Sequence, residues 1–174
     1  LEDAPVRVRN ALEERVQALC PEHVEKVYPY LGRLMSLPLD EQMEEQLADL
    51  DCRELRGRTI HAVELLLACV AACHPLVLVC EDLHWSGPSS LALLEHLLDL
   101  TDRVPLLLIC VFRPERDHGS WRLRETVGRL YGHRHTDLWL QPLSGTDSET
   151  LVGNLLCVQD LPEQLKGRIL DQAE

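Results

Sequence analysis

The sequence predicts an α/β fold with a parallel sheet. Two aliphatic runs without polar alternation, Leu76–Cys80 and Leu106–Phe112, are typical of strands buried on both faces of such a sheet. Between them, Pro88 opens a segment, Ser89–Leu100, whose leucines recur at helical spacing. Strand, helix and strand within about thirty-five residues form a βαβ unit, so the two strands are expected to be parallel.

Apolar residues at helical spacing predict further helices before this unit. They are expected over residues 3–20, 22–35 and 40–51. Asp40 is expected to cap the third of these, an acidic and solvated helix. Thr59 is expected to cap a fourth helix, which must end where His74 precedes Pro75.

The chain after the βαβ unit predicts shorter elements. A helix is expected over residues 121–131, followed by a third short strand at Asp137–Leu140. Ser144 or Thr146 is expected to cap the next helix, and a last helix is expected from Pro162. These elements complete the pattern of alternating strands and helices.

The composition excludes several classes of protein. With 45% hydrophobic residues and 26% charged residues, the chain is neither collagen-like nor disordered. The 29 acidic and 17 basic residues give a net charge of −12, which argues against binding to a nucleic-acid backbone. The most apolar stretch is interrupted by His74-Pro75, and no signal peptide is evident. We therefore expect a cytoplasmic domain that contacts neither nucleic acid nor membrane.

The seven cysteines show no CxxC spacing, so they are interpreted as small buried hydrophobic residues of a reducing compartment. They are Cys20, Cys52, Cys69, Cys73, Cys80, Cys110 and Cys157. An alternative is a metal site built from Cys69 and Cys73 with His74, or from His133 and His135.

Charged residues follow both predicted buried strands. Glu81 and Asp82 come directly after Cys80, and Arg113 follows Phe112. Because ligands of parallel sheets bind beyond the carboxyl ends of the strands, these side chains can converge on one site. Two carboxylates and an arginine suit a polyphosphate with a bound Mg²⁺ ion. The alternative roles are a helix-dipole or capping role for the acids and a surface salt bridge for the arginine.

The segment PLVLVCEDLHWSGPSSLALLEHLL, Pro75–Leu98, resembles the Walker B segment of STAND or AAA-like ATPases. Val104–Glu115 resembles the strand that ends in the nucleotide-sensing arginine of that family, and Leu138–Ser144 resembles the next strand, which leads into the lid helices. The resemblance covers the chain from about residue 59 onward. It implies a three-layer P-loop NTPase-like core with a parallel sheet, found in large bacterial signalling regulators including LuxR-type transcription activators.

The resemblance also implies roles for single residues. Glu81 matches the Mg²⁺-associated acid, Asp82 the water-orienting catalytic acid, and Arg113 the phosphate-sensing arginine. His84 and Trp85 match a motif whose expected role is structural, with Trp85 packing under the site and His84 bonding the neighbouring loop.

Two departures from the family pattern bear on function. Relatives commonly carry a second Asp where this chain has Gly87, and no GxxxxGK[ST] loop occurs in its 174 residues. We therefore expect an interior portion of the ATPase core that lacks the Walker A strand and loop. The expected parts are a helical region (1–58), the Walker B and sensor-strand part (59–143) and the truncated start of a helical lid (144–174).

Two functions follow as expectations. The first is part of an ATP-binding and ATP-hydrolysing signalling switch that uses Mg²⁺ and acts with other domains, although the isolated chain would bind ATP weakly. The second is a nucleotide-independent scaffold with a degenerate ATPase fold, in which the acids serve as helix caps.

Overall fold

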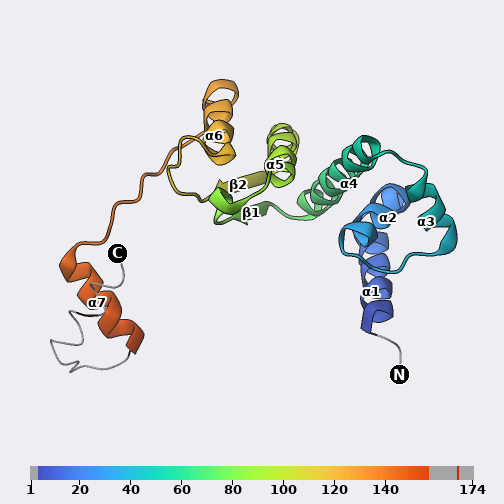
Figure 1. Ribbon diagram of the computed structural model, residues 1–174, viewed down its shortest axis with the longest axis horizontal. Coiled ribbons are helices and arrows are strands. Elements are labelled where there is room, and N and C mark those ends of the chain that lie inside the picture. Colours follow the sequence, from blue (N-terminus) through green and yellow to red (C-terminus); the bar gives the residue numbers. More distant parts are fainter. Residues whose placement is uncertain (1–3, 157–167, 169–174) are drawn as a thin grey trace. The chain divides into compact units, whose positions relative to one another are not determined.

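A computed structural model describes residues 4–156 and residue 168. The chain divides into two compact units, Leu1–His135 and Thr136–Glu174, and each is described by itself. In order along the chain, the first unit forms α1 (Ala4–Leu19), the 3₁₀ turn η1 (Pro21–His23), α2 (Val24–Leu34), α3 (Glu41–Ala48), α4 (Cys52–Cys73), β1 (Leu76–Cys80), the 3₁₀ turn η2 (Leu83–Trp85), α5 (Pro88–Leu100), β2 (Leu106–Cys110) and α6 (Gly119–Leu130) (Figure 1). The second unit contains α7 (Gly145–Leu156). The described chain is mostly helical with a two-stranded parallel sheet, which is compatible with the predicted α/β class.

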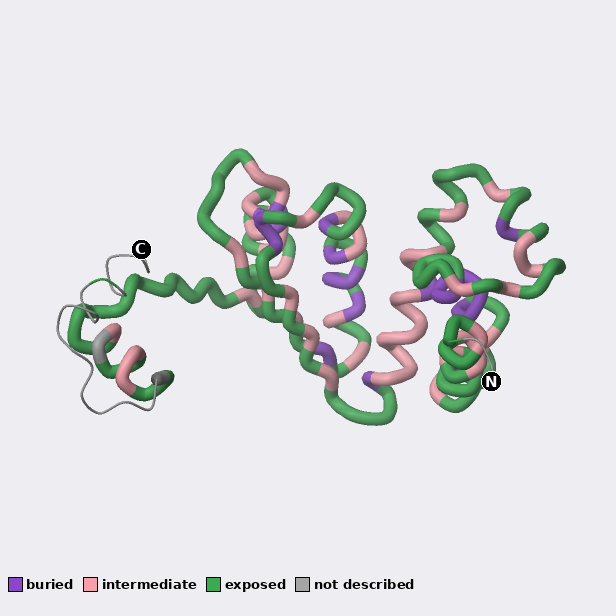
Figure 2. Tube along the Cα trace, turned by 60° about the horizontal axis from the view of Figure 1, so that its bottom comes forward, coloured by how far each residue is buried: buried purple, intermediate pink, exposed green. Residues whose placement is uncertain are grey.

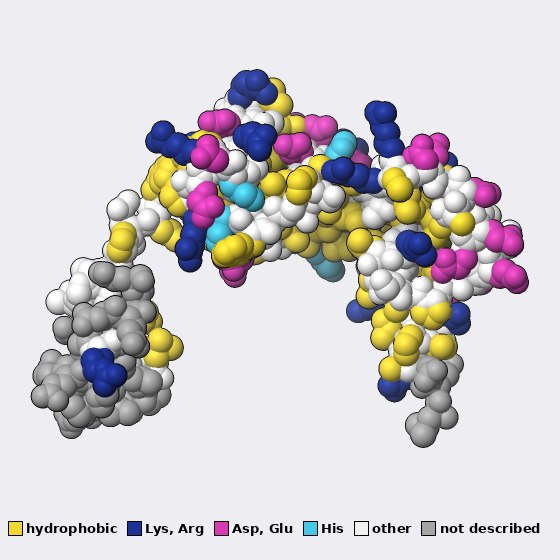
Figure 3. Space-filling view, in the orientation of Figure 1, with side chains coloured by type: hydrophobic (Ala, Val, Ile, Leu, Met, Phe, Trp, Pro, Cys, Tyr) yellow, Lys and Arg dark blue, Asp and Glu magenta, His cyan; other side chains and the backbone are white. Residues whose placement is uncertain are grey.

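The first four helices build a hydrophobic core of their own. Val16 of α1 and Val27 and Leu31 of α2 are buried there, and apolar residues of α4 pack against them. The predicted acidic helix is confirmed as α3, in which Asp40 accepts the backbone N–H of Met43 at 2.9 Å. Acidic side chains gather over this helix, which is largely exposed apart from the buried Leu47 (Figure 3).

The start of the fourth helix was wrongly predicted. The carboxylate of Asp51 accepts the backbone N–H groups of Arg53 and Glu54, at 2.8 and 2.7 Å, so α4 begins at Cys52. Thr59 instead lies inside the helix, where its hydroxyl donates to the carbonyl of Leu55. The expected border between residues 58 and 59 thus falls within a continuous helix.

Helix α4 links the helical core to the sheet. Its Val63 and Leu66 pack against the helical core, whereas its Leu67 packs against the core beside the sheet. An ion pair between Glu64 of α4 and Arg103 supports this connection. Burial alone would raise the pKa of Glu64, but the hydrogen bonds from Arg103 and His61 outweigh it and lower the pKa.

The two strands pair in parallel and in register, from Leu76 opposite Leu106 to Cys80 opposite Cys110, with α5 as the crossover. One face of this sheet packs on the leucines of α5, of which Leu97 and Leu100 are each 1% exposed. The buried residues gather in α2 and α5 (Figure 2). The βαβ unit is therefore confirmed.

The expectation that these strands are buried on both faces is wrong for the described chain. Successive side chains of a strand point to opposite faces, and the residues that alternate with the packed ones are open to solvent. Val77 is 55% exposed and Ile109 is 40% exposed. A continuous aliphatic run is therefore compatible with a sheet that has one open face in this chain.

In the second unit the expected strand at Asp137–Leu140 is not formed. Leu138 and Leu140 are 83% and 87% exposed, and the segment joins no ladder among residues 4–156. A strand needs a partner for its backbone groups, which an apolar pattern does not supply. The predicted cap is confirmed, because the Ser144 hydroxyl accepts the Asp147 N–H at 3.2 Å. The helix expected from Pro162 lies outside the described residues.

None of the described helices combines the length and the apolar character needed to cross a bilayer.

The cysteines differ in exposure, which corrects the expectation that all are buried. Cys20 is buried, but Cys52 and Cys73, at the two ends of α4, are exposed. Cys69, Cys80 and Cys110 are half-buried, and Cys157 lies outside the described residues.

We expect alkylation by iodoacetamide at pH 8 to distinguish these thiols. Burial raises the pKa of Cys110 to about 11, and burial together with a hydrogen bond to Cys69 raises the pKa of Cys20 to about 12. Because the thiolate is the reactive form, Cys110 should react about 100-fold and Cys20 about 1,000-fold more slowly than Cys52 and Cys73. Peptide mass spectrometry over time would measure the rates, with the urea-unfolded chain as control. Equal alkylation rates for Cys110 and Cys52 in the folded chain would contradict the burial of Cys110 beside the sheet.

Candidate functional site

The loops that follow β1 and β2 lie together at the carboxyl edge of the sheet. Beyond the strands, the Val111 N–H donates to the carbonyl of Cys80 at 2.8 Å, and the Leu83 N–H donates to the carbonyl of Val111 at 3.0 Å. The backbone pairing thus continues past both strand ends. It brings the segment that contains Glu81 and Asp82 beside the segment that leads to Arg113, as the parallel strands predicted.

The loop after β1 has an unusual and well-anchored backbone. Asp82 adopts the left-handed conformation, with φ 53° and ψ 35°, which Asp tolerates better than most residues. The chain then forms the η2 turn, in which the Trp85 N–H donates to the carbonyl of Asp82. Leu83, 4% exposed, inserts into the core beside the sheet and holds the loop in place.

The side chains of Glu81, Asp82 and Arg113 are all exposed at this edge. No ion pair joins the arginine to either acid in the described part of the chain. Neither acid caps a helix by a side-chain hydrogen bond, because the N-cap of α5 is Gly87 and Asp82 makes no such bond to η2. The described residues therefore show no side-chain capping by either acid, and a helix-dipole role for the acids stays a prediction.

The side chains of Glu81, Asp82 and Arg113 are of the types that bind a hard cation together with a phosphate group. Mg²⁺ is bound in proteins by one or two carboxylates together with water and phosphate oxygens, and Glu81 and Asp82 offer exposed carboxylates. A guanidinium such as that of Arg113 grips phosphate oxygens through paired N–H groups. The 174 residues contain no glycine-rich loop with a following lysine of the kind that cradles phosphates.

His84 and Trp85, the two residues whose expected role is structural, differ in burial. His84 is buried, at 8% exposed, and its Nδ1 lies 3.5 Å from the backbone nitrogen of Arg113. Trp85 is 80% exposed, so the expectation that it packs under the site is wrong. Its ring centroid lies 5.3 Å from that of His84. Nothing in the sequence signalled that this tryptophan would be exposed at the edge of the site.

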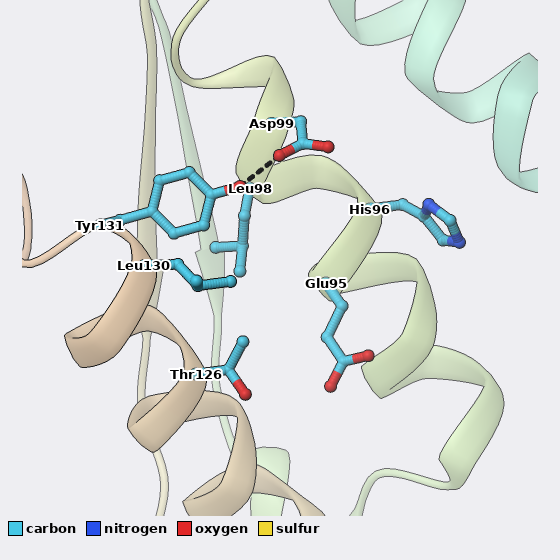
Figure 4. A pocket seen from close by; sticks show the side chains of 7 residues that line it. All are labelled: Glu95, His96, Leu98, Asp99, Thr126, Leu130 and Tyr131. Carbon is cyan, nitrogen blue, oxygen red and sulfur yellow. Dashed lines mark hydrogen bonds between the residues drawn. The ribbon is translucent and has the colours of Figure 1, made fainter.

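Away from this edge, a depression of about 340 Å³ lies between α5 and α6 (Figure 4). Glu95, His96 and Asp99 of α5 line it opposite residues of α6 and Tyr131. The Tyr131 hydroxyl donates to the carboxylate of Asp99, and this hydrogen bond raises the pKa of Tyr131. His96 is exposed on the surface of α5.

The alternative metal site finds no support in the part of the chain that the structure describes. No group of three or more His, Cys, Asp or Glu side chains there is arranged to hold a metal ion. Cys69 and Cys73 do share α4, but Cys73 is exposed at its end.

Comparison with known proteins gives one match. The family model of the AAA ATPase domain matches residues 4–109. The chain belongs to this AAA ATPase domain family. The match includes both acids at the end of β1 and ends before Arg113. It also includes α1–α3, which the resemblance reached only weakly. No curated protein and no solved structure matches the chain. Membership supports an AAA-like, nucleotide-hydrolysing ATPase module.

Proposed function

We propose that this AAA ATPase chain forms the acidic and arginine-bearing side of a Mg²⁺-dependent ATP site in a signalling switch. The observation that carries the proposal is the continued pairing of the two loops, from Cys80 to Val111 and from Val111 to Leu83. It brings the acids and Arg113 to one edge of the sheet, where parallel sheets bind their ligands.

The exposed carboxylate of Glu81 would hold the metal, directly or through water, and Asp82 would orient the attacking water. Bound Mg²⁺ would neutralise charge on the phosphates. Arg113 would bind phosphate oxygens and report whether the terminal phosphate is present, which is the property that a switch needs. The remaining phosphate contacts would come from a glycine-rich loop outside these residues.

The natural protein that contains this chain offers a direct test of Arg113. We expect Arg113→Ala to weaken ATP binding in the presence of Mg²⁺ by about 10- to 150-fold, the value of a charge-assisted hydrogen bond. Arg116→Ala is the matched control: it removes the same charge from the same loop, and the Arg116 guanidinium lies 5.7 Å from the ring of Trp121.

Isothermal titration calorimetry would measure both affinities. Equal losses in the two variants would mean that Arg113 acts only through long-range charge. No loss in either variant would remove Arg113 from the phosphate contacts, whereas no ATP binding to the natural protein would favour the nucleotide-independent scaffold, which Gly87 also favours.

A further inference from the structure

The buried imidazole of His84 lies between the two loops of the candidate site. It is one of two buried polar side chains in the described residues, and the hydroxyl of the other, Ser120, lies 2.9 Å from Nδ1 of His118. The Nε2 atom of His84 is buried and has no hydrogen-bond partner in the described part of the chain. A buried polar atom without a partner is costly, so its persistence here calls for a role.

The contact that Nδ1 makes on the other side of the ring indicates which nitrogen of His84 carries the proton. Nδ1 faces the backbone N–H of Arg113 at 3.5 Å, a long contact in which the nitrogen can only accept. A neutral imidazole with an accepting Nδ1 carries its proton on Nε2. The unpartnered atom of His84 is therefore a donor.

An acceptor close to that donor belongs to a residue of the site. Oδ1 of Asp82 lies 3.9 Å from Nε2, which is too far for a hydrogen bond. The Asp82 side chain is 77% exposed, whereas that of His84 is 5% exposed, so the carboxylate can move to meet a fixed ring.

We propose that His84 is a positioning residue that ties the two strand ends together. Its Nδ1 accepts the Arg113 N–H, and its Nε2–H directs the carboxylate of Asp82. The ring thus sets the distance between the acid that follows β1 and the arginine that follows β2. This inference rests on the proposed function for its purpose, but its geometry can be tested without nucleotide.

NMR of the ¹⁵N-labelled chain tests the first half. We expect the Nε2–H tautomer of His84, with a proton that exchanges about tenfold faster in Asp82→Gly. Glycine tolerates the positive φ of residue 82, so this variant removes the carboxylate without straining the loop. Glu81→Ala is the matched control and should leave the signal unchanged. The Nδ1–H tautomer, or the same exchange rate in Asp82→Gly, would overturn the proposal.

Two substitutions of the ring test the second half. The Asn side chain places an acceptor near the position of Nδ1, whereas Gln places a polar atom near that of Nε2. We expect the Arg113 amide to exchange roughly 5- to 10-fold faster in His84→Gln but to stay protected in His84→Asn. The Leu83 amide, which donates to Val111, is the internal reference for an intact loop. Equal exchange rates of the Arg113 amide in both variants would overturn the proposal that His84 ties the two strand ends together.

The two proposals fail separately. Intact coupling of His84 to Asp82 with no ATP binding in the natural protein would overturn the proposed function alone. ATP binding with an uncoupled His84 would overturn only this inference. If a His84 variant does not fold, the Asp82→Gly experiment, which keeps the ring, decides the question.

Discussion

Replacing Asp82 by Asn is expected to slow ATP hydrolysis by the natural protein by about 10²–10⁴-fold while ATP binding is mostly kept. The variant is nearly isosteric and removes one negative charge. Asn also accepts the left-handed conformation of residue 82, so the loop keeps its φ of 53°. The change therefore tests the carboxylate itself, which an Ala variant with a strained backbone would not do.

Glu81→Gln is the companion variant, because it removes the same charge one residue earlier. If Glu81 holds the metal, this variant should require more Mg²⁺ for half-maximal activity and should regain turnover at high Mg²⁺. Asp82→Asn should remain slow at every Mg²⁺ concentration. Steady-state turnover across a Mg²⁺ titration measures both responses.

The outcomes separate the two roles. Unchanged turnover in Asp82→Asn would remove Asp82 from the reaction, and rescue of that variant by Mg²⁺ would exchange the roles of the two acids. A protein that does not hydrolyse ATP at all would contradict the proposed enzyme rather than the assignment.

Local signals in the sequence predicted most of the elements. The aliphatic runs at Leu76–Cys80 and Leu106–Phe112 identified both strands, although the second strand ends at Cys110. Where the prediction failed, two signals competed. Thr59 looked like a cap, but Asp51 offers a charged acceptor at the helix start and forms a reciprocal capping box with Glu54.

Predictions that depend on non-local contacts were less accurate. An apolar pattern indicates which residues can be buried, but not whether a partner covers them, as the open side of the sheet at Val77 and Val79 shows. At the site, the parallel strands were sufficient to place Asp82 and Arg113 at one edge. They could not reveal the left-handed Asp82 or the exposed Trp85, since both depend on the path of the loop.

The largest effect on stability is expected from Leu97→Ala. Leu97 is 1% exposed and belongs to the core that joins α5 to the sheet. Truncating a leucine at such a position costs about 2–5 kcal/mol, because the transfer free energy is lost and a cavity remains. A domain of this kind has a free energy of unfolding of about 5–15 kcal/mol, so the variant should lose a large part of it.

Leu130→Ala is the matched control, since Leu130 lies at the end of α6 and is 58% exposed. It should change the free energy of unfolding by no more than about 0.5 kcal/mol. Urea unfolding followed by circular dichroism measures both variants, and the m-value should stay constant if only stability changes. Equal effects at Leu97 and Leu130 would contradict the packing of α5 on the sheet. The relative placement of Asp82 and Arg113 depends on that packing, because Leu83, which anchors the acidic loop, inserts into the same core.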